Sequence, residues 1–137
     1  MARAKHINPR VPLEDEEVAA FHQWLQIKGI PHTHVPNEIG GSTPAMKARA
    51  IKMKRLGTSK GFPDLLLFLP IAGTTGEVDA YQPVAIEMKR VRGSTTSPEQ
   101  KAWLKILEMA GIPNAVCKGA EAAISFVQEI LKEVEGA

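Results

Sequence analysis

The chain has 137 residues, of which 44% are hydrophobic, and a formal net charge of +2 at pH 7. This length fits one domain with an apolar core, and no apolar run approaches the roughly 20 residues that a membrane-spanning helix needs. A single cysteine excludes an internal disulfide, and the amino terminus lacks the apolar segment of a signal peptide, so we expect a cytoplasmic protein.

The first twelve residues contain three basic residues and two prolines, a composition typical of a flexible arm. We therefore divide the chain into a flexible basic arm, residues 1–12, and a single folded domain, residues 13–137. Contact between the arm and nucleic acid is one interpretation, and a solvated tail is the default.

Residues Leu13 to Lys28 have the periodicity of an amphipathic helix. Its apolar face consists of Val18, Phe21, Trp24 and Leu25. Two acids, Glu14 and Glu17, lie on or beside this face, where a carboxylate needs a partner. One of them is a candidate metal ligand, and stabilisation of the helix N-terminus is the equally weighted alternative. The sequence does not separate the two acids.

A short strand over His32 to Val35 and a basic helix over Pro44 to Leu56 are expected next. Thr43 is the expected N-cap of this helix, and Gly57 ends it. The positive residues of the helix and of the turn after it are Lys47, Arg49, Lys52, Lys54, Arg55 and Lys60. No acid interrupts them, which favours a surface that binds DNA phosphates over an ordinary solvated helix face.

Two strands carry the residues on which the functional prediction depends. The run Asp64 to Leu69 is apolar after its first residue, so we expect a central strand buried on both faces. The segment Pro70 to Gln82 is rich in glycine and threonine and predicts an exposed turn. The run Pro83 to Arg90 is the second strand, in which Glu87 and Lys89 point to the same face. If the two strands are neighbours, Asp64 comes level with Glu87.

Two converging carboxylates repel each other unless a proton or a cation lies between them. Asp64 and Glu87 therefore predict a site for a hard divalent ion such as Mg²⁺ or Mn²⁺, with Lys89 holding a water or a phosphoryl oxygen beside it. The alternative is an edge-strand salt bridge between Glu87 and Lys89, with Asp64 only capping a turn. We prefer the metal site, because Pro-Asp followed by Glu-x-Lys is the short pattern of the PD-(D/E)xK nuclease superfamily.

The segment after Lys89 begins with a basic loop that contains Arg90 and Arg92. A helix then runs from Pro98 to Ala110, and Ser97 with Gln100 forms a capping box at its start. The residues of this helix expected to face the core are Trp103, Ile106, Leu107 and Ala110. The capping box is a sufficient structural reason for Gln100.

A short strand over Ala115 to Cys117 and a closing helix over Ala120 to Val134 complete the domain. The helix carries apolar residues at helical spacing, namely Ile124, Val127, Leu131 and Val134, and is expected to serve packing only. The expected fold class is α/β, with a restriction-endonuclease-like core in which helices flank a central mixed sheet of about four strands.

The combined motifs resemble the VRR-NUC nuclease family, a branch of the PD-(D/E)xK superfamily, in its stand-alone phage or bacterial form. The matching stretches are Gly61-Phe62-Pro63-Asp64-Leu65-Leu66-Leu67, Ile86-Glu87-Met88-Lys89-Arg90, Gly93, Ser97-Pro98-Glu99-Gln100-Lys101-Ala102-Trp103-Leu104 and Gly111. Their joint spacing is far more specific than the superfamily pattern, and the resemblance extends from about Glu14 to Leu131.

The resemblance implies an endonuclease dependent on Mg²⁺ or Mn²⁺, in the cytoplasm of a bacterium or a phage-infected cell. Asp64 and Glu87 match the metal carboxylates, Lys89 matches the lysine of the motif, and Met88 would lend its backbone carbonyl to the ion. Gln100 matches the family's glutamine, and Glu17, or Glu14 in its place, would be the acid of the first helix. The basic residues assigned to DNA are Lys52, Lys54, Arg55, Lys60, Arg90 and Arg92.

We expect a homodimer that cuts branched DNA, most of all four-way (Holliday) junctions, by phosphodiester hydrolysis. Resolving a junction needs two opposed cuts, and a two-fold dimer supplies two active sites from one chain. The rival prediction is a non-catalytic nucleic-acid-binding or assembly module that keeps the nuclease fold. The three residues Asp64, Glu87 and Lys89 disfavour it, since a binding module needs none of them.

Overall fold

The computed structural model describes residues 13–36 and 41–135, and the predicted basic arm lies outside this range. The helices within it are α1 (Glu14–Lys28), α2 (Pro44–Arg55), α3 (Pro98–Met109) and α4 (Ala120–Glu135). The strands are β1 (His32–His34), β2 (Leu65–Ala72), β3 (Val78–Lys89) and β4 (Asn114–Lys118). The predicted α/β fold with a mixed sheet is confirmed.

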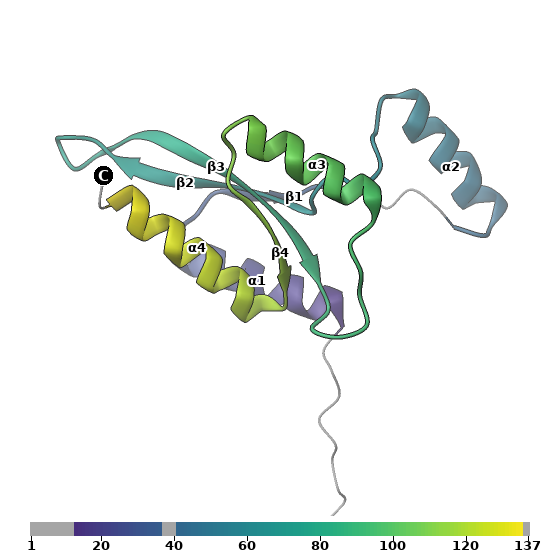
Figure 1. The fold of residues 1–137 in the computed structure, drawn as a ribbon, viewed down its shortest axis with the longest axis horizontal. Coiled ribbons are helices and arrows are strands. Elements are labelled where there is room, and N and C mark those ends of the chain that lie inside the picture. Colours follow the sequence, from purple (N-terminus) through teal and green to yellow (C-terminus); the bar gives the residue numbers. More distant parts are fainter. Residues whose placement is uncertain (1–12, 37–40, 136–137) are drawn as a thin grey trace, which may run out of the picture.

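The described strands form one sheet in the order β1-β2-β3-β4 (Figure 1). β1 and β2 pair antiparallel, as do β2 and β3, whereas β3 and β4 pair parallel. Leu65 lies opposite Ile86 in the central pair, so the start of β2 meets the end of β3. This register brings Asp64 level with Glu87, as the sequence predicted.

The hairpin between β2 and β3 is longer than expected, and the prediction of an exposed turn from Pro70 to Gln82 is wrong. β2 continues to Ala72 and β3 begins at Val78, with Pro70 opposite Tyr81. A proline lacks the N–H that a ladder needs, so it is tolerated only where that N–H would face an open edge. Phe68 N–H donates to Pro31, at the β1 edge, and two residues later Pro70 faces the same edge beyond the end of β1.

The same reason explains Pro83 in the middle of β3. Ala85 N–H donates to the carbonyl of Pro113, at the β4 edge, and Pro83 faces this edge before β4 begins. Short outer strands therefore let both prolines lie in the two longest strands.

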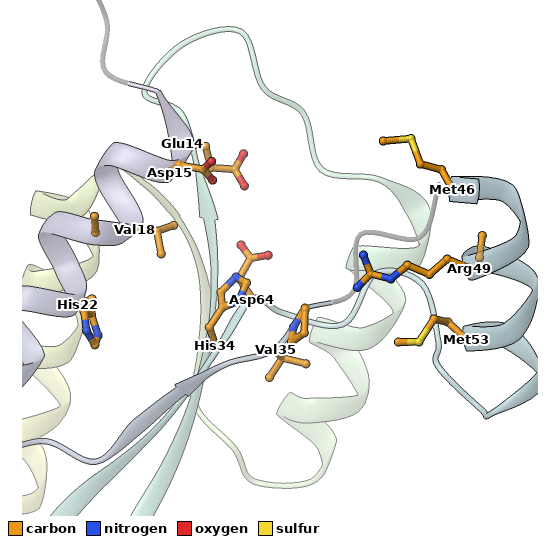
Figure 2. Close-up of a pocket in the computed structure, with 13 residues that line it drawn as sticks. Glu14, Asp15, Val18, His22, His34, Val35, Met46, Arg49, Met53 and Asp64 are labelled. Atoms are coloured by element: carbon orange, nitrogen blue, oxygen red, sulfur yellow. The ribbon is translucent and has the colours of Figure 1, made fainter. Parts of the chain in front are cut away.

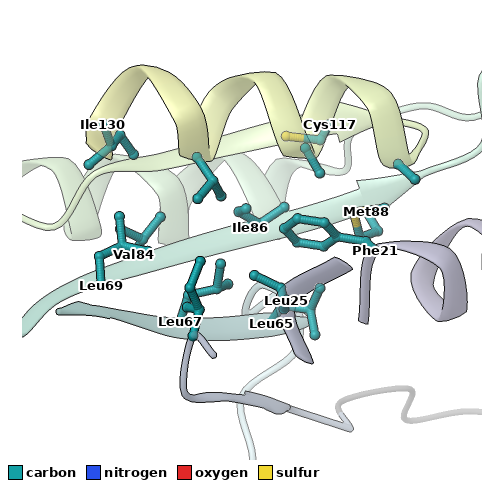
Figure 3. Packing of buried hydrophobic residues seen from close by; sticks show 14 residues of the cluster. Phe21, Leu25, Leu65, Leu67, Leu69, Val84, Ile86, Met88, Cys117 and Ile130 are labelled. Atoms are coloured by element: carbon teal, nitrogen blue, oxygen red, sulfur yellow. The ribbon is translucent and has the colours of Figure 1, made fainter. Parts of the chain in front are cut away.

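The hydrophobic core lies on the sheet face covered by α1 and α4 (Figure 3). From the sheet it contains Leu65, Leu67, Leu69, Val84, Ile86 and Met88, and from the helices Phe21, Leu25, Ala123 and Val127, all 0–2% exposed. The predicted apolar faces of both helices are thereby confirmed. β2 is not buried on both faces as expected, since Leu66 is half-buried and Phe68 is 39% exposed.

α3 lies on the opposite face of the sheet and covers only part of it (Figure 1). Leu107 is buried and Trp103 is half-buried, but Ile106 is 54% exposed and Ala110 is exposed, so the core prediction fails for the last two residues. Leu107, near the C-terminal end of the helix, is its one buried residue. The N-terminal end of α3 is the part that contacts the candidate site.

α2 projects away from the sheet and the other helices (Figure 1). Thr43 caps it by accepting a hydrogen bond from the Met46 N–H at 3.1 Å, as predicted. None of its residues is buried, and Ile51 is 61% exposed. The helix therefore gains its stability from local capping and hydrogen bonds, with little burial of side chains.

Candidate active site

Asp64 is placed at the site by the start of β2 and by a hydrogen bond across the sheet. Its Oδ2 accepts from the Met88 N–H of β3 at 2.9 Å, and its carbonyl accepts from the Val35 N–H at 2.6 Å. The carboxylate is thus fixed beside the end of β3.

Glu87 is a buried acid, with only 4% of its surface exposed. Its Oε1 accepts a hydrogen bond from Gln100 Nε2 at 2.8 Å and lies 3.5 Å from Lys89 Nζ. Its Oε2 is buried and has no hydrogen-bond partner within the described residues. Burial, and then the charge of Asp64, raise the pKa of Glu87 from 4.5 to about 7. The site therefore holds an acid whose ionised form lacks part of the solvation it needs.

Gln100 forms the predicted capping box and also contacts the buried acid. Its side-chain Oε1 accepts from the Ser97 N–H at 2.9 Å, and its own N–H donates to Ser97 Oγ at 3.2 Å, which completes the capping box. With its amide oxygen held by the backbone, its Nε2 is directed at Glu87. The cap of α3 therefore orients the amide that contacts the buried acid.

The segment before Asp64 is attached to the first turns of α3, a feature that sequence analysis missed. Gly61 has φ +92°, and a Cβ there would lie 2.6 Å from the backbone carbon of Glu99. Phe62 packs edge-on against Trp103 with 5.1 Å between ring centroids. Only a glycine permits so close an approach. The sequence signal for this contact was Gly61 itself, which is the first residue of the stretch that resembles the family motif.

Lys89 is held inside the site, where its side chain is 13% exposed. It pairs with Glu87, so the salt bridge of the alternative interpretation exists. Its setting differs from that interpretation, because β3 lies between β2 and β4 and is a central strand. An ion pair at the surface of an edge strand would leave Glu87 exposed, which it is not.

The two acids of α1 lie in different surroundings. Glu17 Oε2 accepts from the Ala120 N–H at 2.6 Å, at the first residue of α4. Glu14 lines a pocket together with Asp64, and its charge contributes to the raised pKa of Glu87. A carboxylate at a helix N-terminus is stabilised by that helix. Glu17 thus joins α1 to α4, and Glu14 is the acid of α1 whose charge acts on Glu87.

The donor set around Glu87 suits a hydrated divalent cation. No group of three or more His, Cys, Asp or Glu side chains is arranged as a metal cage in residues 13–36 and 41–135. Mg²⁺, however, is commonly bound through one or two carboxylates and keeps several waters. The unsatisfied Oε2 of Glu87 is the atom that such an ion would satisfy. The N–H and C=O of a strand residue point to the same edge, so the Met88 carbonyl faces the side of Asp64.

A sequence profile of the VRR-NUC domain matches residues 10–121. The chain belongs to the VRR-NUC family. A solved structure described as a VRR_NUC domain protein has a TM-score of 0.64 and 25% sequence identity, and the match covers 90% of this chain and 91% of that chain. No curated protein sequence matches the chain significantly. Fold and family therefore identify a nuclease domain, which implies DNA as its substrate.

The basic residues of this VRR-NUC domain are spread around the candidate site. Lys52, Lys54 and Arg55 are exposed on α2, and Lys60 is exposed in the turn that precedes Asp64. In the loop after β3, Arg92 is exposed and Arg90 is half-buried. Their contact with DNA stays a prediction. None of the helices in the described part of the chain is long and apolar enough to cross a membrane.

A cavity of about 600 Å³ adjoins the site of the VRR-NUC domain, between α1, the end of β1 and α2 (Figure 2). Asp64 and Glu14 stand on its border, and Arg49 of α2 extends into it from the far side. Sequence analysis treated Arg49 only as part of a basic stretch. Its position follows from where α2 lies in space, which no local pattern in the sequence indicates.

Proposed function

We propose that this VRR-NUC protein is a metal-dependent endonuclease that hydrolyses phosphodiester bonds in branched DNA. The observation that carries the proposal is Glu87, a buried acid next to Asp64 with one oxygen unsatisfied. Burying a carboxylate without a full set of partners is unfavourable, and a fold gains from it only if the acid binds a cation or a proton. Lys89 and Gln100, both in contact with Glu87, supply the remaining groups of a hydrolytic centre.

Asp64, Glu87 and the Met88 carbonyl are the proposed metal ligands, with Glu14 as the acid from α1. Glu14 is preferred to Glu17, because Glu17 is already used by the N-terminus of α4. A bound Mg²⁺ or Mn²⁺ would polarise the scissile phosphate and lower the pKa of a water. The proposed role of Gln100 is to keep the Glu87 carboxylate in one orientation through its 2.8 Å hydrogen bond.

Lys89 is the proposed catalytic cation. Its ammonium lies 3.5 Å from Glu87 Oε1, on the face where the phosphate would approach. A charge held there stabilises negative charge as it develops on the phosphoryl oxygens, and it needs no reorganisation during the reaction. Since this contact strengthens in the transition state, its removal should lower kcat more than affinity.

Branched DNA, and four-way junctions in particular, is the proposed substrate, and a homodimer is the proposed active species. α2 exposes Lys52, Lys54 and Arg55 on an arm that projects from the body of the domain. Such an arm suits phosphates that lie away from the cleavage site, as in a second DNA arm. Exposed Ile51 on the same helix and exposed Leu56 at its C-cap suit a contact with a second copy.

The test is cleavage of a panel of labelled DNAs: a duplex, a flap, a splayed arm and a four-way junction labelled on each strand. Reactions contain Mg²⁺, Mn²⁺ or excess chelator, and light scattering gives the oligomeric state at the working concentration. We expect paired cuts in the junction, a requirement for the divalent ion, and a dimer.

Three outcomes would contradict parts of this proposal separately. Undiminished cutting in chelator would contradict the proposed metal requirement. Equal cutting of plain duplex would contradict the selectivity for branched DNA and indicate a general nuclease. Binding of DNA without cleavage under any condition would favour the rival, a non-catalytic module with the nuclease fold.

A further inference from the structure

The cavity beside Asp64 has no role in the proposed hydrolysis. It measures about 600 Å³, and its border includes both Asp64 and Glu14. Ligand pockets commonly span about 300–1,000 Å³. The volume of this cavity lies within that range and is large enough for one nucleoside. Whatever occupies it would touch the groups that act on the scissile phosphate.

The walls of the cavity carry imidazole rings on one side and thioethers on the other. His22 of α1 and His34 of β1 lie on one side, and Met46 and Met53 of α2 lie on the other (Figure 2). Imidazole rings and thioethers make favourable contacts with aromatic faces. A planar, unsaturated ring system in the cavity would therefore meet side chains of this kind at either wall.

The charges around the cavity are divided between its two sides. Arg49 extends from α2 toward the border at Asp64, whereas Glu14 and Asp15 lie at the α1 side (Figure 2). A guanidinium binds a phosphate, and carboxylates accept hydrogen bonds from exocyclic amino groups of bases. A nucleotide, which has an anionic end and amino-bearing edges, complements this arrangement.

We propose that this cavity binds one unpaired nucleotide of the DNA strand, next to the phosphate that is cut. The inference rests on the proposed function, which brings that phosphate to Asp64. A base inside a duplex is stacked and paired, so only an unpaired base, as at a branch point, enters without the free energy needed to extrude it. The cavity would then contribute to the selection of branched over perfect duplex DNA.

The experiment uses the full-length protein and short duplexes that differ only in one unpaired nucleotide at the centre, in excess chelator so that nothing is cut. The unpaired position carries 2-aminopurine, whose fluorescence reports stacking, and anisotropy of a terminal dye gives affinity. Ala19→Trp and Ala50→Trp each fill the cavity, one from α1 and one from α2. The matched control is Ala20→Trp, also exposed on α1 but outside the cavity.

We expect the protein to prefer the DNA with the unpaired nucleotide by about tenfold or more, which corresponds to about 1.4 kcal/mol. Both cavity-filling variants should lose this preference and the 2-aminopurine response, and Ala20→Trp should keep them. Because none of the three positions is buried, the variants should fold alike.

Two results would overturn the inference. If both cavity-filling variants keep the preference and the fluorescence response, the base binds elsewhere. If the protein shows no preference at all, the cavity does not read unpaired bases. Cleavage by the same proteins in Mg²⁺ separates the two proposals. If the cavity does not bind the unpaired base but the protein still cuts DNA, the proposed nuclease function is unaffected.

Discussion

The site at the end of the β2–β3 pair and the basic helix α2 differ in how they are attached to the domain. Asp64 and Glu87 are held by hydrogen bonds from Met88 and Gln100, on strands and a helix that pack together. α2 has no buried residue and projects from the sheet. Chemistry needs atoms placed to within fractions of an ångström, and binding of phosphates needs only charge within reach. The difference in attachment matches the proposed tasks of the two regions.

The largest effect is expected from the acids at the end of the β2–β3 pair. Asp64→Asn and Glu87→Gln should each reduce cleavage to background and leave DNA affinity in chelator within about twofold, because the proposed contacts with phosphates are on α2. Single-turnover cleavage and fluorescence anisotropy measure the two quantities. Loss of affinity in step with rate would show that the two regions are not separate in function.

Lys89→Ala should lower the single-turnover rate by about 10²–10³-fold, the usual effect of removing one group that stabilises the transition state. The concentration of Mg²⁺ that gives half-maximal cleavage should change little, since Lys89 is not a proposed ligand. Titration of the metal at saturating DNA distinguishes the two effects. If saturating DNA restored the rate, Lys89 would instead position the phosphate.

Substitution of two glycines tests the close contact between Gly61 and α3. Gly61→Ala forces a Cβ to within 2.6 Å of α3 backbone at φ +92°, whereas Gly57→Ala, just after α2 at φ +97°, meets nothing within 4 Å. Both variants bear the strain of a left-handed residue, about 1–2 kcal/mol, and Gly61→Ala adds the steric conflict. We expect Gly61→Ala to unfold at clearly lower urea concentration and to cut more slowly. Equal losses of stability would contradict the close contact with α3.

The buried acid also predicts how stability depends on pH in the absence of metal. The pKa of Glu87 rises from 4.5 to about 7 in the fold, so between these values the folded form binds more protons than the unfolded form. Stability should therefore fall as the pH rises from about 5 to 7, by at most about 3 kcal/mol, and level off above. Urea unfolding in chelator measures this slope, which Glu87→Gln should flatten. If Glu87→Gln leaves this dependence of stability on pH unchanged, other titrating groups cause it.

The smallest expected effect separates the two acids of α1. Glu17→Gln should lower stability by about 0.5–1 kcal/mol, because the N-terminus of α4 loses a charged acceptor, with the metal requirement unchanged. Glu14→Gln should raise the Mg²⁺ concentration needed for half-maximal cleavage and leave stability nearly unchanged. Thermal melts and metal titrations of the pair check this assignment. The reverse pattern would make Glu17 the ligand.

Local pattern was enough to predict most of the elements and the central pair of acids. Hydrophobic spacing gave α1, α3 and α4, and caps gave the starts of α2 at Thr43 and α3 at Ser97. The placement of Glu87 and Lys89 on one face follows from the two-residue period of a strand, which any sequence obeys once the strand forms. These features depend on neighbours in the chain, so the sequence alone determines them.

Other features depend on contacts between distant segments, and only the tertiary structure decided them. Which acid of α1 is engaged by another helix depends on where α4 begins, because the N-terminus of α4 binds Glu17. Pro70 fits within β2 only because β1 is short, and the exposure of Ile106 depends on how little of the sheet α3 covers. Periodicity states which residues share a face, and it does not state what the fold places against that face.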